Sequence, residues 1–273
     1  MGVQGFALLA LLCAGAATAP KNASHALVAG RRRRLSYQYA QIAKLTASDA
    51  AAEDAFGYSV AIDGNTVVVG SRYDDDAGTN SGSAYVLRTT DGGATYVEVA
   101  KLTAADAASG DGFGYSVAIA GDTVAISGGG SVYIFRTTDG GGTWSQVAKL
   151  VASDGVSVSR VAISGDVVVA GATSDDSTAI NAGAVYVFRT SDGGATYAQV
   201  AKLTASDAAA HDYFGYSVAI DGDTIVVATY LKDAAYIFRT SDGGATYGKV
   251  ATLTPSAAAA HGCSDESVAV HGG

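Results

Sequence analysis

The chain has 273 residues, 48% of them hydrophobic by type, which excludes a disordered tail and suffices for one sizeable core or one repeat array. The chain has 35 glycines and only two prolines, and the glycines lie between β-branched runs, as expected of turns between strands. The formal net charge of −9 argues against nucleic acid and anionic lipid as partners.

Residues 1–19 are predicted to be a secretory signal peptide, because an apolar run from Phe6 to Ala16 is followed by small residues through Ala19. Cleavage after Ala19 or nearer Ala16 remains open. The run is about 14 residues long, short against the roughly 20 needed to cross a bilayer. We therefore expect a secreted or extracellular protein with no membrane span after cleavage.

Residues 20–36 are predicted to be a linker or propeptide. This segment carries the basic run Arg31, Arg32, Arg33 and Arg34, which is either a processing site or a solvated linker. Asn22 starts the only glycosylation sequon, Asn22-Ala23-Ser24. Removal of residues 1–34 would leave 12 basic residues against 26 acidic ones, a net charge of −14 that suits cation binding or simple solubility.

Cysteines and histidines offer little chemistry. Cys13 lies in the signal and leaves Cys263 alone, so the mature chain can form no internal disulfide. The four histidines show no zinc-binding spacing: His25, His211, His261 and His271. No cofactor is certain from the sequence, and calcium is the one that it suggests.

Residues 37–273 contain an internal repeat. The segment FGYSVAI begins at Phe56, Phe113 and Phe214, and degraded copies surround Val161 and Val268. Equivalent valines recur at intervals of 44 to 57 residues, a period typical of propellers and solenoids. Each full repeat has four strand-like segments, the number in an antiparallel propeller blade. We expect an all-β propeller of about four full blades plus partial ones.

The two ends of the repeat region predict an open or incomplete ring. Residues 37–45 match the fourth strand of a blade, and Ser267 to Val270 match the start of a first strand. Two strands separate these positions within a blade, so the ends cannot share one hydrogen-bonded ladder. The exposed edges would allow self-association. Whether the chain is a fragment of a longer propeller stays open.

A hairpin motif recurs between the third and fourth strands as TTDGGATY from Thr89, with three close copies. It resembles the Asp-box of sialidase and BNR repeats. An Asp side chain can accept backbone N–H bonds across such a turn, and glycine supplies positive φ. Because every blade has a copy, we expect the four aspartates to stabilise turns: Asp91, Asp139, Asp192 and Asp242.

The pair Phe56-Gly57, the strand VVVG and the connection DDDAGTNSGSAYV together resemble FG-GAP repeats over about residues 37–270. The resemblance implies a propeller, often of seven blades, like that with which integrin α chains bind protein partners and hold calcium in blade loops. The chain departs from that group because it has only four full repeats and lacks the Asp-x-Asp-x-Asp-Gly calcium pattern.

Long acidic loops mark one face. The second-to-third strand loop is long in the first and third repeats and short in the second and fourth. Loops on one face of a repeat array commonly form its interaction surface. Calcium could bind in such a loop through aspartates, and in the first loop also through Asn80 and carbonyl oxygens, with a solvated acidic turn as the alternative. The candidate ligands are Asp74, Asp76, Asp175 and Asp176, and Asp75 is expected to face away from Asp74.

The resulting prediction is a secreted or cell-surface module that binds an extracellular protein or glycan ligand, mediates adhesion and is not an enzyme. The alternatives are a sialidase-like or other glycan-acting hydrolase and a calcium-binding structural repeat protein. Repetition accounts for four arginines without catalysis: Arg88, Arg136, Arg189 and Arg239. Arg72 and Arg160 lie outside this pattern but are too few to indicate a catalytic arginine cluster.

Overall fold

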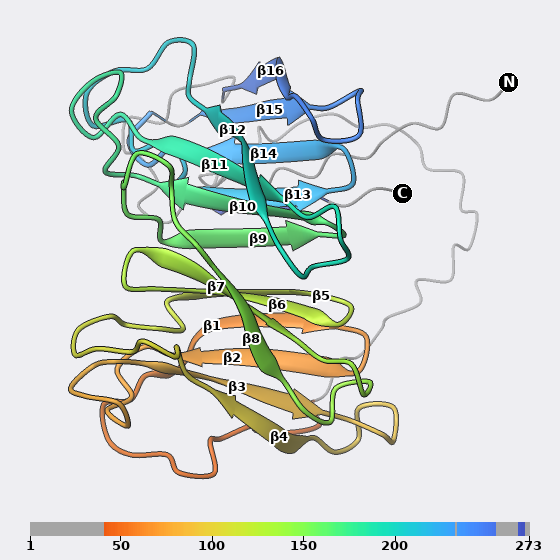
Figure 1. Ribbon diagram of the computed structural model, residues 1–273. Coiled ribbons are helices and arrows are strands. Elements are labelled where there is room, and N and C mark those ends of the chain that lie inside the picture. Colours follow the sequence, from red (N-terminus) through yellow and green to blue (C-terminus); the bar gives the residue numbers. More distant parts are fainter. Residues whose placement is uncertain (1–40, 233, 255–266, 271–273) are drawn as a thin grey trace, which may run out of the picture.

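The computed structural model describes residues 41–232, 234–254 and 267–270. They form four four-stranded antiparallel sheets, each a propeller blade, which follow one another in chain order (Figure 1). Blade 1 contains β1 (Phe56–Asp63), β2 (Thr66–Ser71), β3 (Ser83–Arg88) and β4 (Val97–Leu102). Blade 2 contains β5 (Ser116–Ala120), β6 (Thr123–Gly128), β7 (Ser131–Arg136) and β8 (Ser145–Leu150). Blade 3 contains β9 (Arg160–Ser164), β10 (Val167–Ala172), β11 (Ala184–Arg189) and β12 (Ala198–Leu203). Blade 4 contains β13 (Ser217–Asp221), β14 (Thr224–Ala228), β15 (Ala235–Arg239) and β16 (Gly248–Leu253).

Each blade is a meander with strands in the order of the sequence. The β1–β2 hairpin pairs Asp63 with Thr66, and Gly64 between them takes a φ of +53°, which glycine adopts at little cost. The following run, Val67 to Val69, is almost fully buried, as expected of an interior strand covered on both faces. The predicted all-β fold of four propeller-like blades is confirmed.

The core lies between blades. Val68 and Val86 of blade 1 pack with Val117 and Ile126 of blade 2, and blades 2 and 3 and blades 3 and 4 repeat this arrangement. The first strands of successive blades lie beside one another. Stability therefore depends on contacts between neighbouring repeats, as in other repeat arrays.

The connection between blades 1 and 2 is bonded to both of them. Gly110 and Phe113 donate backbone hydrogen bonds to Thr79 and Ser81 in the β2–β3 loop of blade 1. Nearby, the Ala105 N–H donates to Gln146 Oε1 on β8 of blade 2 (2.9 Å). In the same short stretch, Asp106 pairs with Lys149, also on β8 (2.6 Å). The connection thus positions the loops of one blade against the strands of the next.

The two ends of the series differ. The Val268 N–H donates to Ser217 Oγ at 3.1 Å, the same contact that Val161 makes with Ser116 Oγ between blades 2 and 3. Residues 267–270 thus occupy the position of the first strand of a further blade. At the other end, Val60 on β1 is 60% exposed, whereas its equivalent Val117 is 7% exposed.

Several predictions fall on other parts of the chain. The signal peptide 1–19, the 20–36 segment with Asn22 and Arg31 to Arg34, and Cys263 lie outside the described residues. Within the described ranges, no helix has the length and apolar character to span a bilayer.

Candidate functional site

A buried tyrosine of the third strand anchors a polar cluster in each blade. In blade 1, the Tyr85 hydroxyl donates toward Asp49 Oδ1 and Asp74 Oδ2, each at 2.8 Å. In blade 3, Tyr186 contacts Asp154 and Asp175 in the same way. A lysine completes each cluster: Lys101, Lys149, Lys202 and Lys232. Because all four blades have one, we interpret these Tyr–Asp–Lys clusters as supports for the connections and loops.

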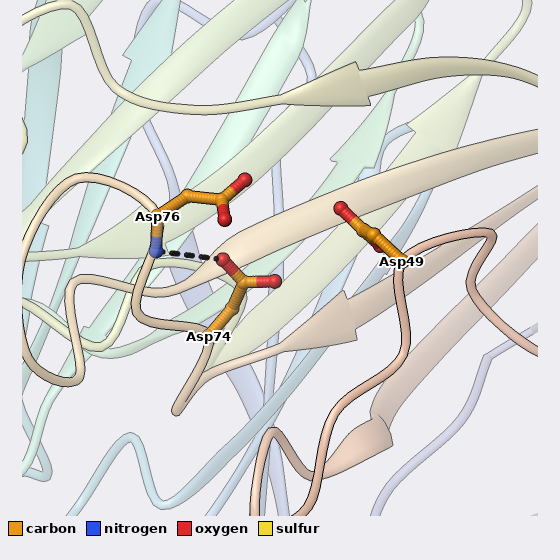
Figure 2. A group of neighbouring side chains, drawn as sticks. All are labelled: Asp49, Asp74 and Asp76. Carbon is orange, nitrogen blue, oxygen red and sulfur yellow. Dashed lines mark hydrogen bonds between the residues drawn. The ribbon is translucent and has the colours of Figure 1, made fainter.

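The cluster of blade 1 contains two of the predicted calcium ligands. The carboxylates of Asp49, Asp74 and Asp76 approach one another, with ligand oxygens within 4.8 Å (Figure 2). Lys101 Nζ contacts all three, at 2.6 Å from Asp49, 3.0 Å from Asp74 and closer to Asp76. Asp75 instead accepts a hydrogen bond from the Asn80 N–H in its own loop.

The ammonium group of Lys101 holds the position that a cation would take among these carboxylates. Burial raises the pKa of Asp74, but hydrogen bonds from Lys101 and Tyr85 lower it by more, so the carboxylate stays ionised. The same acidic neighbours raise the pKa of Lys101 despite its burial. Calcium would have to displace this lysine, and its binding here stays a prediction.

The other predicted pair does not converge. Asp175 is 1% exposed and bonds Tyr186, Ser177 and Lys202 Nζ, the last at 2.7 Å. Asp176 turns to its own loop and accepts the Asn181 N–H at 2.6 Å. The two carboxylates therefore bind different groups and do not form one ligand pair.

We expect Asp175 to contribute stability that depends on pH. Burial raises its pKa, but hydrogen bonds from Lys202 and Ser177 outweigh burial and lower the pKa from 3.8 to about 2. A depressed pKa stabilises the fold above the unfolded value and loses this effect as the pH falls toward the folded value. Asp175→Asn should therefore cost about 2 kcal/mol at pH 7 and progressively less between pH 4 and pH 2. Denaturant titrations of both proteins across this range measure the difference, and a constant difference would contradict the assignment.

The four Asp-box aspartates lie on exposed hairpins and bond within them. Asp91 accepts the Thr95 N–H at 2.9 Å and the Thr95 hydroxyl at 2.6 Å, and these bonds hold its pKa well below the usual range. Thr89 also donates to this carboxylate. The other three carboxylates make the same contacts: Asp139, Asp192 and Asp242. Each contact lies within a single turn.

Repeated arginines connect the hairpins of blades 2, 3 and 4 to the preceding blade. A Cβ at Gly141 would lie 2.9 Å from Arg88 Cζ, so the Arg88 side chain of blade 1 packs directly on the blade 2 hairpin. Arg136 approaches Gly194, and Arg189 approaches Gly244, in the same way. These arginines pack between blades.

Arg72 and Arg160 are placed differently from the repeated arginines. Arg72 follows β2, where the other blades have Gly129, Thr173 and Tyr230. Its guanidinium carbon lies 4.7, 4.5 and 4.7 Å from the ring centroids of Tyr58, Tyr73 and Tyr115. One terminal nitrogen donates to the Tyr58 hydroxyl at 2.8 Å, but the buried Nε has no hydrogen-bond partner among the described residues.

A pocket of about 220 Å³ adjoins Arg72 where blades 1, 2 and 3 meet. It exists because two segments are short here: the β6–β7 hairpin of blade 2 and the connection from β8 to β9. Its lining includes Arg72, Asp111, Tyr115, Ser127, Gly129 and Ser159. The volume is below that of pockets for drug-sized ligands and fits one small ring.

Asp111 supplies the acidic side of the pocket. Its Oδ2 accepts the Ala108 N–H at 2.8 Å, a turn bond that Asp54 repeats in blade 1. Its Oδ1 faces Gly129, where a Cβ would lie 3.1 Å away, and makes no hydrogen bond with the described part of the chain. The ion pairs of the described residues do not include Asp111 with Arg72. A carboxylate and a guanidinium thus border one pocket without neutralising each other.

Sequence reasoning did not identify Asp111 as a site residue, since it repeats as Asp54 and Asp212 and resembles a turn device. Its distinctive feature is the neighbouring short hairpin, in which Gly129 carries no Cβ against the carboxylate. The shortness of this hairpin was visible in the sequence and could have indicated the pocket.

The fold is similar to that of solved propeller proteins. The periplasmic gluconolactonase PpgL of Pseudomonas aeruginosa matches with a TM-score of 0.51 and 14% identity over 74% of this chain and 58% of that protein. A candidate 6-phosphogluconolactonase from Bacteroides uniformis matches with a TM-score of 0.52 and 15% identity over 76% of this chain and 59% of that protein. A Lactobacillus plantarum protein matches with a TM-score of 0.52 and 15% identity, over 74% of this chain and 57% of that protein. The chain thus spans less than three fifths of the length of these proteins.

These similarities overturn the prediction of a non-catalytic adhesion module. That prediction excluded catalysis because the repeats offered no evident catalytic constellation, yet propellers of the same architecture include lactone-hydrolysing enzymes. At such low identity the similarity establishes the fold.

No curated protein matches this sequence. The FG-GAP repeat model, in contrast, matches residues 39–87, 96–135, 144–188 and 197–248, which together make up most of the chain and cover all four blades. The motifs that open the first strands, the blade topology and this match agree, and the chain belongs to the FG-GAP repeat family.

Proposed function

We propose that this chain is a hydrolase of small cyclic esters, with its reaction centre in the pocket between Arg72 and Asp111. The observation that carries the proposal is the unneutralised pair of a guanidinium and a carboxylate on one small pocket. The lactonase activity named for propellers of similar fold supports the choice of substrate class.

The two groups have the chemistry that lactone hydrolysis needs. Asp111 Oδ1 accepts a proton from a water molecule as the water oxygen attacks the ester carbonyl carbon, a general-base role. Negative charge then develops on the carbonyl oxygen, where donors of the Arg72 guanidinium stabilise it. The ring C–O bond breaks as the carbonyl re-forms, and the leaving alkoxide takes the proton from Asp111. The product is an open-chain hydroxy acid.

Tyr115 and Gly129 complete the pocket. The Tyr115 ring lies 4.7 Å from the Arg72 guanidinium carbon, which restricts the orientation of that group. Gly129 has a φ of +55° and lacks the Cβ that would crowd Asp111. The Asp111 carboxylate is therefore accessible from the pocket, and the Arg72 guanidinium is held in one orientation. Both properties suit a site for a small ring.

The proposal predicts that the protein hydrolyses D-glucono-1,5-lactone faster than solvent does, as measured by acid release at constant pH. Arg72→Thr introduces the residue of the equivalent position in blade 3 and should lower kcat/KM by about 100-fold to 1000-fold, because one oxyanion donor is lost.

Thr173→Ala, at that equivalent position away from the pocket, is the matched control and should leave the rate unchanged. A wild-type rate equal to the solvent rate for the glucono-lactone, a phosphorylated lactone and a simple butyrolactone would overturn the proposal.

A further inference from the structure

A row of aromatic rings crosses the blades at the start of their first strands. Tyr58 and Tyr115 lie with centroids 5.3 Å apart, and the Arg160 guanidinium carbon lies 4.4 Å from the Tyr115 ring. Arg160 also lies 5.3 Å from the Tyr216 centroid. The row then continues in blade 4 with spacings of 4.7 and 6.0 Å. We define the aromatic row as Tyr58, Tyr115, Arg160, Tyr216, Tyr230 and Tyr213.

Part of this row follows from the repeat, and part does not. Tyr58, Tyr115 and Tyr216 occupy equivalent positions in blades 1, 2 and 4. Blade 3 has Ser159 at this position, and the neighbouring Arg160 lies between Tyr115 and Tyr216 instead. Tyr213 and Tyr230 belong to blade 4 alone. In place of Tyr213, blades 1 and 2 have Ala55 and Gly112, and blade 3 has Val156. In place of Tyr230, the other blades have arginine, glycine and threonine. The blade fold therefore does not require these two rings.

The backbone at Tyr213 makes the ring costly to place. Tyr213 has a φ of +51°, in the left-handed region, where the equivalent Gly112 has +58°. A side chain with a Cβ is strained in this conformation, whereas glycine is not. His211, two residues earlier, also has a positive φ of +65°. The same conformation recurs in blade 1 at Glu53 and Ala55, with φ of +75° and +56°, so the positive φ belongs to the repeated turn, and blade 4 places an aromatic ring there beside Tyr230.

The row remains accessible and has free donors. Tyr58 is 44% exposed, and the other tyrosines of the row are partly exposed. Arg160 Nε donates to the Tyr216 carbonyl at 3.0 Å, while its terminal nitrogens make no hydrogen bond with the described residues. The row thus combines aromatic faces, phenol hydroxyls and guanidinium N–H groups along one line.

From this combination we infer that the aromatic row binds a neutral oligosaccharide, with one sugar ring on Tyr213 and Tyr230 of blade 4. A pyranose ring presents a face of C–H groups that suits the electron-rich face of an aromatic ring. Its hydroxyls can accept from the guanidinium and exchange hydrogen bonds with the phenols. Successive sugars along the chain match a row that crosses several blades.

Other ligand classes fit less well. The net charge of −9 and the acidic loops of blades 1 and 3 oppose nucleic acid and acidic polysaccharides. A quaternary ammonium ligand needs a cage between rings, but the rings of blade 4 contact one another at 4.7 and 6.0 Å. This inference does not depend on the hydrolytic function proposed above.

The test uses the full chain and three neutral probes, cellohexaose, xylohexaose and mannohexaose, in titration calorimetry. The double variant Tyr213→Gly and Tyr230→Thr carries residues that other blades have at these positions, and it relieves the strain at residue 213. We expect at least one probe to bind the wild type, and the double variant to bind it at least about tenfold more weakly, from the loss of two stacking rings. A melting temperature of the double variant that is no lower than that of the wild type excludes unfolding as the cause.

Val97→Ala is the control, because Val97 is an exposed apolar residue (65%) on β4 of blade 1, outside the row. Asp111→Asn should also bind the probe like the wild type, which separates binding from hydrolysis. Absence of binding by all three probes at millimolar concentration would overturn the inference. So would unchanged affinity in the double variant, or tighter binding of an oligogalacturonate than of the neutral probes.

Discussion

Replacing Lys101 with methionine should lower the free energy of unfolding by about 3 to 5 kcal/mol, because removal of one partner leaves buried charge uncompensated. Lys101 Nζ contacts Asp49, Asp74 and Asp76, and the Asp74 side chain is only 5% exposed. The Tyr85 hydroxyl would then contact the carboxylates of Asp49 and Asp74 without a cation nearby. Denaturant unfolding at pH 7 measures the loss.

Lys149→Met in blade 2 is the matched control. Lys149 occupies the same position on its blade but pairs with Asp106 alone, and the two side chains are 37% and 51% exposed. Such an exposed pair typically contributes about 0 to 1 kcal/mol. Equal losses for the two variants would contradict the role given to Lys101. Calcium should stabilise Lys101→Met more than the wild type, since the variant frees the carboxylates that the ammonium occupies.

Asp111→Asn should lower kcat/KM for lactone hydrolysis by about 100-fold to 10,000-fold, because an amide cannot accept the proton of the attacking water. The amide oxygen can still accept the Ala108 N–H, so the turn that places residue 111 should persist. Acid release at constant pH measures the rates, and the melting temperature reports whether the turn is kept.

Asp54→Asn separates catalysis from turn stability. Asp54 makes the same bond in blade 1, to the Ala51 N–H at 2.7 Å, but does not line the pocket. The control variant should retain full activity and lose as little stability as Asp111→Asn. Equal activity of the two variants would show that the Asp111 carboxylate has no role in the reaction.

The repeat made most of the fold predictable, because Phe56, Phe113 and Phe214 mark equivalent first strands and each following β-branched run is buried. The site was harder to predict because its members come from different repeats. Arg72 follows the second strand of blade 1, whereas Asp111 lies in the next connection. The short blade 2 hairpin and the short connection to blade 3 open the space beside them.

The contacts of the acidic β2–β3 loop of blade 1 could not be predicted from the sequence either. Asp74 and Asp76 were visible as a possible ligand pair, but no local pattern indicated that Lys101 on β4 would reach them. A period of two places a side chain on one face of a strand, and it does not specify which loop that side chain meets.

The connection between blades 1 and 2 is bonded to the loops of blade 1 and to the strands of blade 2. A blade therefore cannot be transferred between such chains without part of this connection. Excision of blade 2 from its first strand to its fourth would remove Lys149 and Gln146 and leave Asp106 behind without its partner. A module that preserves both sets of contacts must begin upstream of Asp106 and carry its own connection. The exchangeable unit of this array is therefore offset from the visible blade, with each junction belonging to two neighbours at once.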